Sequence, residues 1–96
     1  MEKTKSYSGL FIITPDKQDT VDEVKSAIGS IISDNSGSVT KENMMGKRML
    51  AYPIKKKKEG VYYEVSFTAE PESVNKMMRL FRINTDILRT LIDKAE

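Results

Sequence analysis

The chain has 96 residues, the length of one small domain, and none of its apolar runs approaches the roughly 20 residues of a membrane span. It contains neither cysteine nor histidine, which excludes disulfides, thiolate nucleophiles and histidine-based catalytic or metal sites. The formal net charge of +2 does not by itself indicate a polyanionic partner. Since the first residues lack the apolar core of a signal peptide, we expect one soluble, cytoplasmic domain over residues 1–96, without catalytic activity, metal or cofactor.

The first predicted element is a strand from Tyr7 to Ile13. Aromatic and β-branched residues gather there, and the turn-forming sequence Thr14-Pro15-Asp16 ends the run. The apolar residues of this run occupy both of the alternating positions of a strand. Because such a strand is apolar on both faces, we expect it at the centre of a sheet.

The second predicted element is a helix. Its apolar residues follow the helical period at Val21, Val24, Ile28, Ile31 and Ile32. Thr20 and Glu23 match a capping box, in which each side chain accepts a hydrogen bond from a backbone N–H at the start of the helix. The cluster of residues 35–38 is expected to end the helix, with Gly37 in the left-handed conformation that helix exits favour.

A β-hairpin is predicted in the middle of the chain. From Val39 to Ile54 the helical period gives way to alternation, and Val61–Thr68 alternates in the same way beyond the connection Lys55–Gly60. Pro53 has no N–H to donate to a neighbouring strand, so the first arm is expected at a sheet edge. Gly46 in the same arm indicates a bulge or bend.

The last two predicted elements are a helix and a strand. Glu70-Pro71-Glu72 is typical of a helix start, and apolar residues at helical spacing continue to about Arg82. The segment 86–92 is too short for a further helix and is interpreted as a strand. The resulting order is βαββαβ, an α+β fold of the ferredoxin-like type. It has a four-stranded antiparallel sheet, two helices on one face, and the first and third strands in the centre.

Basic residues concentrate in one segment of the chain. Residues 41–58 contain seven Lys or Arg and one Glu, a local net charge of plus six (+7 − 1). Such a segment attracts phosphates even in a nearly neutral protein, although a solvated loop explains four consecutive lysines equally well. The predicted phosphate-binding residues of this segment are Lys47, Arg48, Lys55, Lys56, Lys57 and Lys58.

Tyrosines and arginines outside this run are open to two interpretations. Tyr52, Tyr62 and Tyr63 are either stacking platforms for RNA bases or residues that pack against neighbouring strands. The segment 60–65 is similar to the third-strand motif of RNA-recognition modules but has Val61 where an aromatic residue is required. The arginines Arg79, Arg82 and Arg89 form a site only if the fold brings them to the lysine hairpin.

The sheet face opposite the helices is the candidate partner surface. Since the first strand is apolar on both faces, either Leu10 and Ile12 or Phe11 and Ile13 point away from the helices. With neighbouring residues they form an apolar patch that binds a partner, unless long side chains such as those of Arg89 and Glu64 cover it. The predicted partner-binding residues are Leu10, Ile12, Tyr62 and Glu64.

The chain resembles the family of the bacterial small-subunit ribosomal protein S-six over nearly its whole length. The most specific match is the segment 46–54, Gly-Lys-Arg-Met-Leu-Ala-Tyr-Pro-Ile, followed by lysines and Gly60-Val61-Tyr62. Tyr7 before an apolar strand, the segment 80–84 (Leu-Phe-Arg-Ile-Asn) and Ile87-Leu88-Arg89 add support. Ser8 departs from the family, which commonly has an acid there.

The resemblance implies a function. Members have the ferredoxin-like fold, bind the central domain of 16S ribosomal RNA together with the ribosomal protein S-eighteen, and catalyse no reaction. The resemblance thus makes RNA the expected ligand of the six basic residues of segment 47–58, and the match to the terminal family motif adds Arg82 and Arg89 to the predicted RNA-binding residues. The alternatives from other classes are a stand-alone RNA-recognition module, a ligand-sensing domain of the same fold, and an enzyme that uses two carboxylates.

Overall fold

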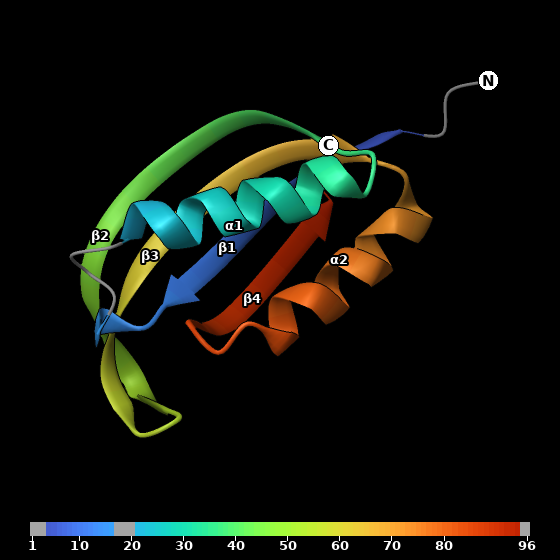
Figure 1. Ribbon diagram of the computed structural model, residues 1–96. Coiled ribbons are helices and arrows are strands. Elements are labelled where there is room, and N and C mark those ends of the chain that lie inside the picture. Colours follow the sequence, from blue (N-terminus) through green and yellow to red (C-terminus); the bar gives the residue numbers. More distant parts are fainter. Residues whose placement is uncertain (1–3, 17–20, 95–96) are drawn as a thin grey trace.

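Two helices cover one face of a four-stranded antiparallel sheet (Figure 1). The computed structural model describes residues 4–16 and 21–94. The elements in chain order are β1 (Lys5–Ile13), α1 (Val21–Asp34), β2 (Ser38–Ile54), β3 (Lys57–Ala69), α2 (Pro71–Ile83) and β4 (Ile87–Lys94). The strand order is β2-β3-β1-β4, so the first and third strands are central and the second and fourth form the edges. This confirms the predicted ferredoxin-like βαββαβ topology.

The main core lies between the sheet and the helices. Phe11 and Ile13 of β1 point to this side and are fully buried, as are Ile28 of α1 and Phe81 of α2. The rings of Phe11 and Phe81 meet edge to face with their centroids 4.8 Å apart, a favoured geometry for two aromatic side chains. Phe11 and Ile13 are therefore the helix-facing pair of β1, and Leu10 and Ile12 point to the other side.

The exit of α1 differs from the prediction in one residue. Ser36, with φ 66°, takes the left-handed conformation that was expected at Gly37. The N–H groups of Ser36 and Gly37 donate to the carbonyl oxygens of Ser33 and Ile32, which is a Schellman motif. Gly37 is needed for space, because a Cβ there would lie 2.8 Å from Cγ2 of Ile32. Thr20 of the predicted capping box lies outside the described residues.

The second helix and the last strand agree with the predictions. Pro71 occupies the first turn of α2, where it has no N–H to leave without a partner, and Glu72 lies near the positive end of the helix dipole. The segment that follows Asn84 forms β4, an extended strand rather than a helix. Neither of the two described helices is long and apolar enough to cross a membrane.

The β2–β3 hairpin is longer than predicted. Its turn consists of Lys55 and Lys56, both with positive φ (49° and 68°), and β3 already begins at Lys57. The predicted connection Lys55–Gly60 was therefore too long, because the alternation of β3 is hidden by its charged first residues. Gly46, with φ 93°, lies at a shift in the β2–β3 register, as expected for a bulge.

A second, smaller apolar cluster covers part of the other sheet face. Ile12 of β1, Leu50 of β2 and Leu88 of β4 are buried there, with Ile54 and Tyr62 packed against them. The hairpin passes so close to β1 that a Cβ on Gly60 would lie 2.4 Å from Cγ2 of Ile12. This cluster therefore fixes the base of the hairpin against the sheet.

Candidate RNA-binding surface

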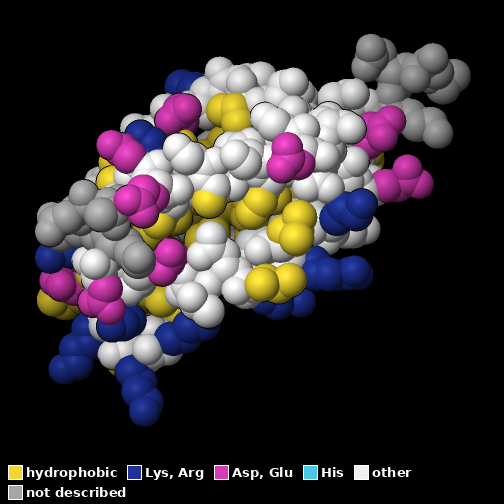
Figure 2. All heavy atoms as spheres, in the orientation of Figure 1, with side chains coloured by type: hydrophobic (Ala, Val, Ile, Leu, Met, Phe, Trp, Pro, Cys, Tyr) yellow, Lys and Arg dark blue, Asp and Glu magenta, His cyan; other side chains and the backbone are white. Residues whose placement is uncertain are grey.

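The hairpin exposes most of its basic side chains. Arg48, Lys55, Lys56 and Lys58 are exposed, and the turn presents two of the lysines at the end of the arm. In Figure 2 Lys and Arg side chains extend from the hairpin at the bottom of the view, whereas most Asp and Glu side chains lie above it, from the base of the hairpin upward. The asymmetry of charge in the sequence is thus also an asymmetry of the surface.

Two of the predicted cations are engaged by carboxylates. The Lys57 ammonium lies 2.6 Å from Oδ2 of Asp16, and the Lys47 ammonium lies 3.7 Å from Oε1 of Glu59. Pairing of this kind reduces the charge available to a phosphate. Within the run of four lysines, Lys57 therefore ties the hairpin to Asp16, just beyond the end of β1. The other three lysines face solvent.

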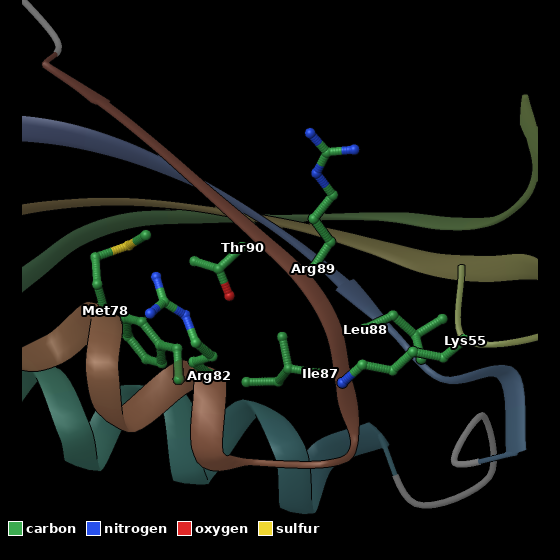
Figure 3. Close-up of a pocket in the computed structure, with 8 residues that line it drawn as sticks. Lys55, Met78, Arg82, Ile87, Leu88, Arg89 and Thr90 are labelled. Atoms are coloured by element: carbon green, nitrogen blue, oxygen red, sulfur yellow. The ribbon is translucent and has the colours of Figure 1, made fainter. Parts of the chain in front are cut away.

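The fold brings the tip of the hairpin to the end of α2 and the start of β4. Lys55, Arg82 and Arg89 line one open cleft of about 240 Å³, whose remaining walls are largely apolar. Figure 3 shows Lys55 extended toward Ile87, while Arg82 and Arg89 lie on opposite sides of the β4 ribbon. Arg82 and Arg89 thus both come near the hairpin tip, but the two side chains extend to different faces of the sheet, and their role in RNA binding stays a prediction. Arg79 is exposed and does not line the cleft.

Of the three candidate stacking tyrosines, Tyr63 belongs to the core. It is 3% exposed, its ring lies 6.4 Å from that of Phe11, and its hydroxyl donates a 3.0 Å hydrogen bond to Glu42. Burial and the Glu42 carboxylate together raise the pKa of Tyr63 well above that of an ordinary tyrosine. Tyr62 is half-buried against the second cluster, whereas Tyr52 is 64% exposed on the hairpin. The packing interpretation is therefore right for Tyr63.

The predicted partner-binding residues lie on the face opposite the helices, but they differ in exposure. Ile12 is only 5% exposed, because Leu50 and Leu88 cover it. Leu10, Tyr62 and Glu64 are half-buried. Leu91 of β4, which the sequence did not single out, lies opposite Leu10 in the sheet and is 42% exposed. The apolar surface open to a partner thus lies at Leu10 and Leu91 rather than at Ile12.

Comparisons with known proteins agree with this architecture. The model of the family described as Ribosomal protein S6, the S-six family, matches residues 6–94. The chain belongs to the S-six family. It is 37% identical over 93 residues to the small ribosomal subunit protein bS6 of Pseudarthrobacter chlorophenolicus, covering 96% of this chain and 92% of that protein. It is 36% identical over 96 residues to bS6 of Exiguobacterium sibiricum, covering 96% and 98%.

Solved structures show the same fold. The crystal structure of 30S ribosomal protein S6 from Thermotoga maritima superimposes with a TM-score of 0.88 at 26% identity, over 97% of this S-six family chain and 89% of that one. The C-terminal domain of the MgtC protein from Mycobacterium tuberculosis matches with a TM-score of 0.67 at 11% identity, over 100% and 93%. The second likeness concerns the fold alone.

Membership of the S-six family identifies the chain as a structural constituent of the small ribosomal subunit, in the cytoplasm. The family is one of ribosomal structural proteins and not of enzymes. Exposed arginine and lysine side chains at the end of an extended arm are suited to contact with RNA phosphates.

Proposed function

We propose that this S-six family protein binds the central domain of 16S ribosomal RNA together with the ribosomal protein S-eighteen. The observation that carries the proposal is that Lys55, Arg82 and Arg89 all border one cleft beside the exposed turn of the hairpin. Residues that are separated by up to 34 positions along the chain (89 − 55) are thereby presented to one polyanionic ligand. Family membership supports ribosomal RNA as that ligand.

The binding mechanism is the displacement of counterions from RNA phosphates by these side chains. Among the described residues, the ion pairs of the protein involve none of Arg48, Lys55, Lys56, Lys58, Arg82 and Arg89. Their charges remain available to phosphate, whereas Lys47 and Lys57 already contact carboxylates. Lysine contacts to the RNA backbone carry no sequence information, so these contacts position the protein on the RNA without reading its bases.

The test is a triple replacement, Lys55→Gln, Lys56→Gln and Lys58→Gln, measured for binding to a central-domain 16S RNA fragment over a series of salt concentrations. The plot of log K against log salt has a negative slope, and each lost phosphate contact makes that slope less steep by about 0.7 to 0.9. Lys76→Gln is the matched control, since Lys76 is exposed but lies beside Asp34, Glu70 and Glu72. If the slope becomes less steep by the same amount in the control and in the triple variant, the proposal is contradicted.

The open sheet face is the proposed surface for S-eighteen. Leu91→Glu places a charge on a side chain that is 42% exposed, so the domain stays folded while an apolar contact with the partner is lost. Ile12→Glu serves as the contrast, because it forces a charge into the second cluster and unfolds the domain. Undiminished binding of S-eighteen by a folded Leu91→Glu protein would place the interface on another face.

A further inference from the structure

Between its last two paired positions, β2 leaves the regular register with β3. Met49 lies opposite Glu59, and the next pair is Ile54 with Lys57. Four residues of β2 (50–53) therefore span the distance that Lys58 alone spans on β3. Such an excess of residues on one strand forces it to bulge away from its neighbour. The exposed residues of this irregular stretch of β2 are Ala51, Tyr52 and Pro53, which we name the 51–53 arch.

Both ends of the arch are held by apolar contacts. Leu50, directly before it, is 9% exposed and belongs to the second cluster with Ile12, and Ile54, directly after it, packs against the same cluster. Pro53 restricts the backbone within the arch. All three residues of the arch are exposed. The arch is therefore a fixed protrusion, and its outward presentation of Tyr52 follows from the anchoring of its two neighbours.

Tyr52 is an unusual residue to find on such a protrusion. Its side chain is 64% exposed, whereas Tyr7 and Tyr63 are buried and Tyr62 is half-buried. The ring lies on the same arm as Arg48, Lys56 and Lys58, all of them exposed. An exposed aromatic ring on a hairpin that also carries exposed cations is complementary to a nucleotide whose base is unpaired: the base covers the ring, and the phosphates meet the cations.

We propose that Tyr52 is a stacking platform for an unpaired RNA base and that the 51–53 arch serves to present it. This inference rests on the proposed RNA binding and adds to it the class of nucleotide that the hairpin recognises. Because every base has a flat face, stacking of this kind tolerates any sequence. The arm thus distinguishes unpaired from paired RNA, which lysines alone do not do.

The test compares Tyr52→Leu and Tyr52→Phe on two ligands, a single-stranded oligoadenylate and a ribose-phosphate strand of equal length without bases. Base stacking on an aromatic side chain is worth roughly 1–3 kcal/mol, so Tyr52→Leu is expected to bind oligoadenylate about 5- to 150-fold more weakly. Tyr52→Phe keeps the ring and binds like the native protein. On the strand without bases the native protein and Tyr52→Leu are expected to bind equally.

The salt dependence separates this inference from the proposed function. Tyr52→Leu changes no charge, so its slope of log K against log salt stays native. The triple lysine variant makes that slope less steep. If Tyr52→Leu binds oligoadenylate with native affinity while the lysine variant has a less steep salt dependence, stacking is overturned and the proposed RNA binding stands. Equal losses on both strands, or a loss seen only when S-eighteen is present, also overturn stacking. Thermal unfolding of each variant verifies that the domain is folded.

Discussion

Replacement of Gly60 by alanine tests the packing that fixes the hairpin to the sheet. The new Cβ would lie 2.4 Å from Cγ2 of Ile12, a branched side chain that is 5% exposed and has little room to move. Gly60 does not have a positive φ, so the backbone itself admits alanine and only the contact opposes it. Overpacking of this kind costs about 1–3 kcal/mol, which lowers the Tm of a domain of this size by about 4–8 °C per kcal/mol.

The assay is thermal or urea denaturation of Gly60→Ala beside Gly29→Ala. Gly29 lies within α1, where a Cβ meets nothing within 4 Å, so alanine there improves helix propensity and stabilises the protein by about 0.4–1 kcal/mol. The same chemical change is thus expected to have opposite signs at two positions. Gly60→Ala as stable as the native protein would show that the hairpin does not pack against Ile12 as described.

Further predictions concern other parts of the fold. Because Glu42 helps raise the pKa of Tyr63, Glu42→Gln lowers it toward the ordinary value in a spectrophotometric titration; an unchanged Tyr63 titration would contradict this. A raised pKa in the folded state means that native stability falls as pH rises past about 10, the ordinary tyrosine pKa, and Tyr63→Phe removes that contribution. Ser36→Gly relieves a positive φ and stabilises by up to about 1–2 kcal/mol in urea denaturation. Amide exchange is slower in Phe11–Ile13 of β1 than in Met49–Tyr52 of β2; the reverse order would refute the topology.

Local patterns in the sequence predicted the elements because those patterns record local geometry. The helical spacing that begins at Val21 and the alternation from Val61 describe which face of one element is apolar, and the structure buries those faces. Pro53 predicted an edge strand because proline has no N–H to donate to a strand on each side, and β2 does lie at the edge of the sheet. The exit of α1 was less well predicted, since both Ser36 and Gly37 suit a turn and only tertiary contact with Ile32 assigns their roles.

The candidate site depended on relations between distant segments. Charge counts indicated a basic hairpin, but the ion pair of Lys57 with Asp16 and the cleft that Lys55 shares with Arg82 arise only when β1, α2 and the hairpin tip come together. The burial of Ile12 has the same origin, because its cover comes from Leu50 and Leu88 on the two edge strands. The sequence by itself determined which residues are apolar, charged or restricted in conformation. The tertiary structure decided which of them meet, because strand register and the course of the hairpin are set by packing across the sheet and not by neighbours in the chain.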